Sequence, residues 1–437
     1  MLGWLLPFLP VPFYAWIYLQ GDALHHRAAL FLIVFLAAQA AYVLCLVVLS
    51  RRRFSLIAVA ASAVISGFLL VPHNPTISTD IYRYIWDGRV TDSGLNVYLH
   101  RPSDLSELQK IDDLYQRMNY RDEYTIYPPF AQWLFYVAHW LYSQLGVWAA
   151  KVFFGLPFLG IGFILWRLLA QSQLPGPRRD WFMLAYALNP LLIFELFGSG
   201  HLDGWAILCI VASYYCYTKK MLQPAVLCIV AASLIKLWPI ILIPALFITL
   251  NRGFTLPKII KNALLTCVSA GLLLSLAYFP FVRDSWFAIT RLQSWGATMS
   301  FNGIYSFLLG ALQAPPAFVQ ITSLLLLVSV TIVAAFKKKL LAAWILTIIT
   351  LLALAPVFYP WYGLVLLPLA VLAKKSHFIY ALAGLYGIVS LTYIQQIDDW
   401  PAWSLVSKSA LLGGIIIIEA LLMLGMLVCL WRRDGSR

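Results

Sequence analysis

The chain has 437 residues, of which 62% are hydrophobic and only 11% are charged, and its mean hydropathy is +0.82. Soluble domains carry about 25% charged residues, so this chain has too little polar surface to cover the cores that its length would otherwise build. The composition excludes a soluble enzyme, a disordered scaffold and a disulfide-built secreted module, and it indicates an all-α polytopic membrane protein.

The net charge of +13 comes from short basic clusters that separate the apolar runs. These clusters lie at residues 51–53, 178–179, 219–220, 252–261, 337–339, 374–375 and 432–433. Loops rich in Lys and Arg stay on the cytoplasmic side of a membrane protein. We therefore interpret the charge as a signal of orientation, and we expect membrane lipids rather than nucleic acid as partners.

Three apolar runs open the chain, near residues 4–19, 28–49 and 54–71, and each approaches the length of about 20 residues that a transmembrane helix needs. The first run lacks a basic leader and a small-residue cleavage site, so we expect a retained helix rather than a signal peptide. Residues 72–127 follow as the first long extracytoplasmic loop. This loop holds nine of the 18 acidic residues.

The loop begins with a segment that is expected to form an amphipathic helix on the membrane surface. The polar residues that would share one face of this helix are Asp80, Arg83, Tyr84 and Asp87. Ser78 or Thr79 can cap the first turn, where the helix dipole favours an ionised Asp80. Two interpretations stay open: Asp80 is a functional carboxylate, or it is only a favourable first-turn residue while Asp87 pairs with Arg83.

The next apolar segment, 128–145, is rich in Trp and Tyr and is expected to be interfacial or re-entrant, because a full crossing would place the basic pair 178–179 outside. The later spans are expected at 147–169, 181–198, 203–218, 222–234, 238–250, 262–281, 318–336, 340–356, 361–373, 377–394 and 409–431. The two segments at 222–234 and 238–250 are too short to cross a bilayer unaided. We expect one integral membrane domain, 1–437, with about 13 or 14 transmembrane helices and both termini in the cytoplasm.

Further polar and aromatic residues recur at the expected external ends of spans. They are Tyr127, His201, Asp203, Lys236, Trp361 and Tyr362. An ionisable residue within an apolar run is costly, so Lys236 is a functional candidate. The H-x-D pair of His201 and Asp203 reads either as two metal ligands or as an ordinary loop hydrogen bond.

The motifs at these positions resemble those of a known family. The most specific block reads D-I-Y-R-Y at 80–84, W-D-G-R at 86–89 and G-L-N-V-Y at 94–98. It is similar to the first-loop signature of bacterial GT-C glycosyltransferases, above all the polyprenol-phosphate-mannose-dependent mannosyltransferases. Later blocks follow in order as I-Y-P-P at 126–129, N-P at 189–190, G-S-G-H-x-D at 198–203, Lys236 with Pro239, and P-W-Y at 360–362.

The resemblance implies a GT-C glycosyltransferase of the bacterial plasma membrane that acts in cell-envelope glycan biosynthesis. It would transfer a mannose-like hexose, with inversion, from a polyprenyl-phosphate donor to a hydroxyl acceptor at the extracytoplasmic face. The acceptor, whether glycan, lipid or protein, stays open. A transporter or flippase of a lipid-linked sugar is the alternative.

The resemblance places the catalytic carboxylate on Asp80. Substrate-binding roles are expected for Arg83, Tyr84, Asp87, Tyr127, His201, Asp203, Lys236, Trp361 and Tyr362. Of these, Lys236 and Arg83, with Arg283 or Arg291, would supply positive charge to the departing phosphate.

No cofactor is expected. The family often carries two acidic residues at the start of its first block, but Thr79 stands at the first position here. The missing carboxylate weakens any proposal of a divalent metal. The six cysteines lie in apolar runs and form no C-x-x-C pair.

Overall fold

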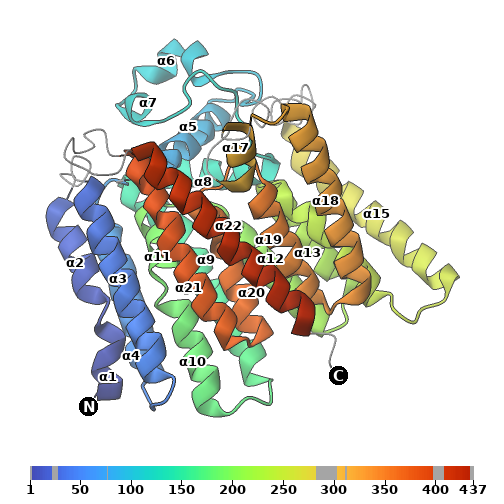
Figure 1. Ribbon diagram of the computed structural model, residues 1–437. Helices are drawn as coiled ribbons and strands as arrows, with labels where there is room; N and C mark the ends of the chain where they lie inside the picture. Colours follow the sequence, from blue (N-terminus) through green and yellow to red (C-terminus); the bar gives the residue numbers. More distant parts are fainter. Residues whose placement is uncertain are drawn as a thin grey trace. The chain divides into compact units, whose positions relative to one another are not determined.

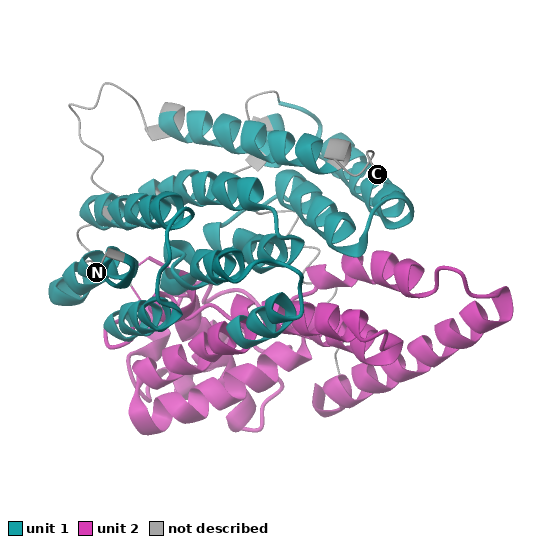
Figure 2. Ribbon diagram, turned by 90° about the horizontal axis from the view of Figure 1, so that it is seen from below, with its two compact units in different colours: residues 1–70, 162–194, 299–437 teal, residues 71–161, 195–298 magenta. Residues whose placement is uncertain are grey.

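The computed structural model describes residues 2–21, 28–75, 77–281, 303–310, 313–396 and 408–433, and within these ranges it contains helices and no β-strand (Figure 1). The chain divides into two compact units (Figure 2). Unit 1 comprises residues 1–70, 162–194 and 299–437, and unit 2 comprises residues 71–161 and 195–298.

Unit 1 is built from helices near both ends of the chain. Its elements are α1 (Leu2–Leu5), η1 (Leu6–Phe8), α2 (Val11–Gln20), α3 (Ala28–Leu49), α4 (Leu56–Leu70), the second part of α9 (Val147–Ala170), α10 (Gly176–Ala187), α11 (Pro190–Ile193), α17 (Gly303–Gly310), α18 (Pro316–Lys337), α19 (Leu340–Leu354), η7 (Pro360–Val365), α20 (Leu366–Ala373), α21 (Ser376–Ser390), η8 (Leu391–Gln396) and α22 (Lys408–Arg433). Buried polar groups join these helices: Tyr42 donates to the carbonyl of Ala185 at 2.7 Å, and the Trp181 indole donates to that of Leu46 at 2.8 Å.

Unit 2 holds the long polar loop and the helices that pack around it. Its elements are α5 (Asp80–Asp92), η3 (Pro102–Asp104), α6 (Ser106–Gln109), α7 (Leu114–Arg117), α8 (Pro129–Leu145), the first part of α9, η4 (Phe194–Gly198), α12 (Asp203–Thr218), α13 (Leu222–Ile235), η5 (Trp238–Leu242), α14 (Ile243–Leu250), α15 (Leu256–Tyr278) and η6 (Phe279–Phe281). Helix α5 packs along α8, and α12 packs along α13.

Gly88 explains why α5 and α8 approach so closely. A Cβ atom at Gly88 would lie 2.0 Å from the carbonyl oxygen of Phe135 on α8. Only a residue without a side chain fits there. The contact lets Tyr84 stack on the ring of Phe135, with ring centroids 4.6 Å apart and an interplanar angle of 3°. The two helices thus form the scaffold of the first loop.

Six of the described helices are long and apolar enough to cross a membrane. They are Ala29–Leu49, Val147–Ala170, Leu256–Phe281, Pro316–Lys337, Ser376–Ile394 and Leu411–Leu430. The bent pair Gly176–Ala187 and Pro190–Gly198 makes a seventh if it counts as one broken span. The chain is therefore an all-α polytopic membrane protein, as its composition predicts.

The number of long spans is smaller than the 13 or 14 helices expected from hydropathy. Five further apolar helices have only 10 to 17 residues, among them Leu222–Ile235 and Trp238–Leu250. These two coincide with the pair that the sequence marked as too short to cross unaided. Short helices of this kind leave backbone ends that must lie against protein or line a cavity. The number of helices that cross the membrane therefore stays a prediction.

Helix α8 occupies the segment for which an interfacial position is predicted. It starts at Pro129, which suits the first helical position, and ends before Gly146, which has φ +91°. One face is buried and the other exposes Trp133 and Trp140, at 42% and 58%. Exposed Trp side chains favour a membrane interface, and the position of α8 in the membrane stays a prediction.

Candidate active site

Helix α5 carries the proposed catalytic carboxylate at its first residue, Asp80. The hydroxyl of Ser78 accepts the Asp80 backbone N–H at 3.4 Å, while the side chain of Thr79 makes no capping bond. The predicted cap is thus supplied by Ser78. At this end of α5 the helix dipole stabilises the ionised form of a carboxylate.

The rest of α5 is enclosed by protein, since residues 81–90 are all buried. Arg83 donates from Nε to Asp87 at 2.9 Å, which confirms the predicted i, i+4 pair. Its other two nitrogens donate to the carbonyls of Tyr120, at 2.6 Å, and Glu123, at 2.9 Å. Arg83 therefore fastens the loop at 120–123 to α5. Substrate roles for Arg83 and Asp87 stay predictions, and their observed contacts are internal.

Two side chains contact the carboxylate of Asp80. Asn119 donates from Nδ2 to Oδ1 at 2.6 Å, and Nδ1 of His201 lies 3.8 Å from Oδ2. The Asp80 side chain is 17% exposed, so it is accessible from outside the protein. Sequence reasoning missed Asn119, because its position beside Asp80 depends on how Arg83 holds the neighbouring loop.

His201 connects Asp80 to a second carboxylate. Its Nε2 atom lies 3.2 Å from Oε2 of Glu195, and its Nδ1 atom lies 3.5 Å from the hydroxyl of Tyr84. The side chains of His201 and Glu195 are both fully buried. The His201 imidazole therefore lies between two carboxylates, 3.8 Å from that of Asp80 and 3.2 Å from that of Glu195.

A tight turn between η4 and α12 fixes His201 against Glu195. The His201 backbone N–H donates to the Glu195 carbonyl at 3.0 Å. The turn passes through Gly200, which has φ +71°, a conformation that favours glycine. A Cβ atom there would lie 2.6 Å from Cδ1 of Ile81 on α5. Gly200 thus lets the turn reach the first turn of the catalytic helix.

The second candidate pair joins the ends of α12 and α13. The ammonium of Lys236 donates to both oxygens of Asp203, at 2.7 and 2.8 Å. Asp203 is the first residue of α12, and Lys236 follows the last residue of α13 in an extended conformation. The H-x-D residues thus diverge, because His201 contacts Glu195 and Asp80 whereas Asp203 binds Lys236.

Aromatic rings pack together beside His201, with Tyr84 as the ring that contacts it. Tyr84 stacks on Phe135 and meets Tyr127 edge-on, with ring centroids 5.3 Å apart. Burial raises the pKa of Tyr84 well above its usual value, with the nearby Tyr127 adding to the effect. Its hydroxyl is therefore a neutral group that can donate a hydrogen bond. The structure thus brings Tyr84 to His201 and Tyr127 to Tyr84.

Lys151 is a buried cation that sequence reasoning missed. It lies in the first turns of α9, is 1% exposed, and donates to the carbonyl of His73 at 2.7 Å. Its Cγ atom would lie 3.4 Å from a Cβ atom at Gly200. The argument that identified Lys236, an ionisable residue in an apolar run, applies equally to Lys151.

Four further residues carry predicted substrate roles. Trp361 and Tyr362 belong to η7 in unit 1, where Trp361 stacks on Tyr359 at 4.5 Å. Arg283 and Arg291 fall outside the described residues. Substrate roles for all four stay predictions. In the part of the chain that the structure describes, no group of three or more His, Cys, Asp or Glu side chains is arranged to hold a metal ion.

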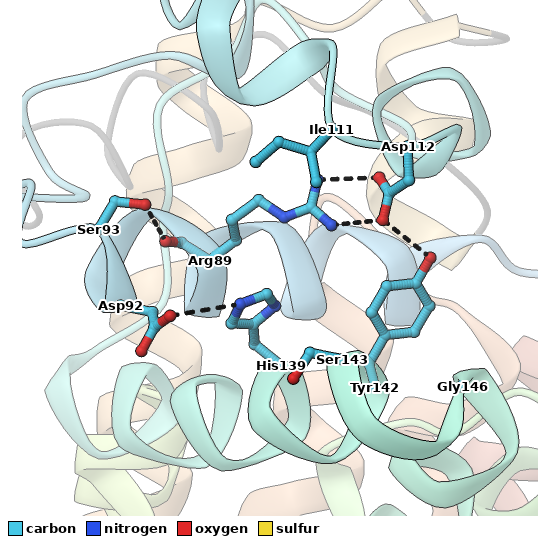
Figure 3. Close-up of a pocket in the computed structure, with 9 residues that line it drawn as sticks. All are labelled: Arg89, Asp92, Ser93, Ile111, Asp112, His139, Tyr142, Ser143 and Gly146. Atoms are coloured by element: carbon cyan, nitrogen blue, oxygen red, sulfur yellow. Dashed lines mark hydrogen bonds and ion pairs between the residues drawn. The ribbon is translucent and has the colours of Figure 1, made fainter.

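A polar pocket of about 540 Å³ lies at the opposite end of α5. Figure 3 shows its lining residues, which are Arg89, Asp92, Ser93, Ile111, Asp112, His139, Tyr142, Ser143 and Gly146. Arg89 binds both oxygens of Asp112, at 2.9 and 2.6 Å, and Tyr142 donates to Asp112 at 3.3 Å. His139 lies 3.7 Å from Asp92.

The pocket groups have perturbed protonation equilibria. Burial alone would raise the pKa of Asp112, but the hydrogen bonds from Arg89 and from the Leu114 backbone outweigh it, and the pKa is lowered. Burial lowers the pKa of His139, and the charge of Arg89 adds to this effect. The carboxylate of Asp112 is thus held in its ionised form by a cation, as in a structural ion pair.

Comparison with known proteins gives one match. A family model described as alpha-(1->6)-mannopyranosyltransferase, N-terminal domain, matches residues 5–252, which is more than half of the chain. The matched range includes Asp80, His201, Asp203 and Lys236, and it excludes Trp361 and Tyr362. No curated protein and no solved structure matches the chain.

Proposed function

Since the chain belongs to the alpha-(1->6)-mannopyranosyltransferase family, and is thus a membrane mannosyltransferase, we propose that it uses a polyprenyl-phosphate-linked mannose as donor. The acceptor is a hydroxyl group, the reaction takes place at the extracytoplasmic face, and the configuration at C1 inverts. The single observation that carries this proposal is the position of Asp80, which is accessible yet held by Asn119 and His201.

The proposal of a lipid-linked donor rests on the architecture. Nucleotide-binding folds of the βαβ type hold a nucleotide at the carboxyl ends of parallel strands. The described ranges contain no strand and consist largely of apolar helices. A donor carried by a lipid would reach the protein from the bilayer without needing such a domain.

Asp80 is assigned the role of general base. The acceptor hydroxyl attacks C1 of the mannosyl group while Oδ2 of Asp80 takes its proton, and the bond between C1 and the phosphate oxygen breaks. The lipid phosphate leaves with the electron pair. A single displacement of this kind inverts C1 and needs one carboxylate beside the acceptor, unlike the carboxylate pair of most glycosidases.

Lys236 is assigned to the departing phosphate. A positive group fixed near developing negative charge lowers the barrier because no reorganisation is needed during the reaction. Asp203 binds the ammonium through both oxygens, so the ammonium group has a defined position, and the Lys236 side chain is 14% exposed. Arg83 receives no such role here because its nitrogens are engaged with Asp87 and the loop at 120–123.

The test is incubation of the purified protein with polyprenyl-phosphate mannose and candidate hydroxyl acceptors. Product mass and the anomeric configuration by NMR are the readouts. Asp80→Asn should abolish transfer, whereas Asp92→Asn, at the other end of α5 and 53% exposed, should leave it unchanged. Retained activity in folded Asp80→Asn, or a product with retained configuration, contradicts the assignment.

A further inference from the structure

Two fully buried ionisable side chains, His201 and Glu195, lie behind the proposed base. Burying a carboxylate is costly unless it is paired, and Glu195 is paired with His201. We propose that His201 and Glu195 form a proton relay that takes up, through Asp80, the proton released by the acceptor. This inference rests on the proposed transferase function. Both residues act through Asp80 and are therefore positioning residues.

The relay requires one tautomer of the imidazole. Nε2 lies 3.2 Å from the Glu195 carboxylate, which accepts but cannot donate a hydrogen bond when ionised, so the relay places the proton of the neutral ring on Nε2. The lone pair of Nδ1 then faces the Tyr84 hydroxyl, at 3.5 Å, and Oδ2 of Asp80, at 3.8 Å. An unprotonated nitrogen facing Asp80 is the arrangement that a proton acceptor requires.

The proton balance closes within these three side chains. The O–H bond of the acceptor breaks, its oxygen bonds to C1, and its proton moves to Oδ2 of Asp80. That proton passes to Nδ1 of His201, and the resulting imidazolium is stabilised by Glu195. After product and lipid phosphate leave, the proton returns through Asp80 to water. Nothing is oxidised or reduced, and the protein ends in its starting state.

The 3.8 Å separation between Asp80 and His201 is longer than a hydrogen bond, as is common before substrate binds. An ionised Asp80 and the lone pair of Nδ1 have no proton between them and repel each other. Once Asp80 carries the acceptor proton, its O–H group can donate a hydrogen bond to Nδ1. The contact therefore tightens only when the proton has arrived.

The elements of unit 2 that form this region carry several charged and titratable groups. They are Asp80 and Tyr84 on α5, Tyr127 before α8, Lys151 on α9, Glu195 on η4, Asp203 on α12 and Lys236 after α13. Asp203 is compensated by Lys236, whose ammonium binds both of its oxygens. Among these groups, the carboxylates nearest to the His201 nitrogens are thus those of Asp80 and Glu195.

The first test is the pH dependence of transfer in Glu195→Gln. Removing the negative charge weakens proton binding by the His201–Asp80 pair, so the acid limb of the kcat profile should move to lower pH by about one unit. The plateau of kcat should fall about tenfold, while KM for the donor stays unchanged. The matched control is His139→Gln, a buried histidine beside Asp92 in the pocket of Figure 3, which should leave the limb in place.

Each outcome of this test decides the matter. An acid limb that stays in place in Glu195→Gln, with or without a lower rate, overturns the relay and leaves the pair a structural contact. A wild-type protein that transfers no mannose overturns the proposed function instead. The two failures are distinguishable because the first requires an active wild type.

A second measurement needs neither transfer activity nor a Glu195 variant. In protein labelled with ¹⁵N-histidine, Asp80→Asn removes one of the two carboxylates beside His201. The midpoint of one imidazole resonance should then shift to lower pH by about half a unit or more, while the remaining histidines keep theirs. Identical midpoints for all histidines in wild type and Asp80→Asn would show that Asp80 and His201 do not share a proton.

Discussion

A carboxylate and a histidine lie near each end of helix α5, but the charges around the carboxylate differ between the two ends. At the pocket end, Asp112 accepts two hydrogen bonds from Arg89, an obligate cation. At the first residue of the helix, Asp80 is contacted by the amide of Asn119 and by the imidazole of His201. The Asp112 carboxylate is neutralised by a permanent charge, whereas Asp80 is contacted by an amide, which stays neutral, and by an imidazole, which is charged only when protonated.

Each end also places a histidine beside a carboxylate. His201 lies 3.2 Å from Glu195 and both are fully buried, whereas Asp92, 3.7 Å from His139, is 53% exposed. Water can solvate the exposed carboxylate of Asp92, whereas the buried carboxylate of Glu195 is compensated by protein groups, His201 and Ser199 among them. A buried carboxylate whose partner can gain or lose a proton is thus the better candidate for a catalytic role. A carboxylate paired with arginine is the better candidate for a structural role.

After Asp80→Asn, the largest effect is expected for Lys236→Met, which removes the cation assigned to the lipid phosphate. We expect kcat to fall by about 100-fold, since loss of one preorganised electrostatic group costs about that much. Because Lys236→Met also leaves Asp203 uncompensated, Lys236→Met/Asp203→Asn is measured beside it. Lys110→Met, an exposed lysine near the pocket end, is the control. Equal kcat values in wild type and the double variant would remove Lys236 from the mechanism.

Arg89→Met, at the pocket end, should lower the stability of the protein rather than act on the chemical step. It leaves Asp112 without its cation, and we expect a loss of about 2 kcal/mol of stability, less than for a fully enclosed pair because Asp112 is 29% exposed. Arg89→Met/Asp112→Asn should recover part of that loss. Thermal unfolding in detergent measures both. A normal unfolding temperature with much reduced kcat would reverse the roles assigned to the two ends.

Local patterns were enough to predict the elements that carry the site. The start of α5 near Asp80, the pair of Arg83 and Asp87, the tight turn at His201 and the two short helices before and after Lys236 all follow from spacing, capping and hydropathy. These features depend on residues only a few positions apart. The family match then shows that the chain is a mannosyltransferase, as the resemblance of its motifs implied.

Contacts between distant segments could not be predicted in the same way. Asn119 meets Asp80 across 39 positions, and Lys236 meets Asp203 across 33. Nothing in the local sequence reports which oxygen each will contact. Lys151 is a different case, because its place in an apolar run was visible. Hydropathy alone also does not register where an apolar run breaks into two short helices, as it does between Leu222–Ile235 and Trp238–Leu250.

A smaller effect is expected for Asn119→Ala, which removes the amide that donates to Oδ1 of Asp80. The carboxylate would keep its charge but lose its fixed orientation, so kcat should fall about tenfold with KM unchanged. Asn262→Ala, whose amide donates to Asn251 in another part of unit 2, is the matched control. If both alanine variants lose the same activity, the effect is one of general stability and Asn119 does not orient the base.

The smallest effect is expected at the pocket end, in the pH dependence of stability. Burial lowers the pKa of His139 in the folded protein, with Arg89 adding to the shift, so the unfolded chain binds this proton more readily. Stability should therefore decrease as the pH falls from about 6.5, the ordinary histidine value, toward the lowered folded pKa, and level off below it. His139→Gln should remove this decrease, flattening the unfolding temperature between about pH 6.5 and 5 by roughly 2 °C or less. An unchanged slope in His139→Gln would mean that His139 titrates alike in both states and that the contrast between the two buried histidines lies in their partners alone.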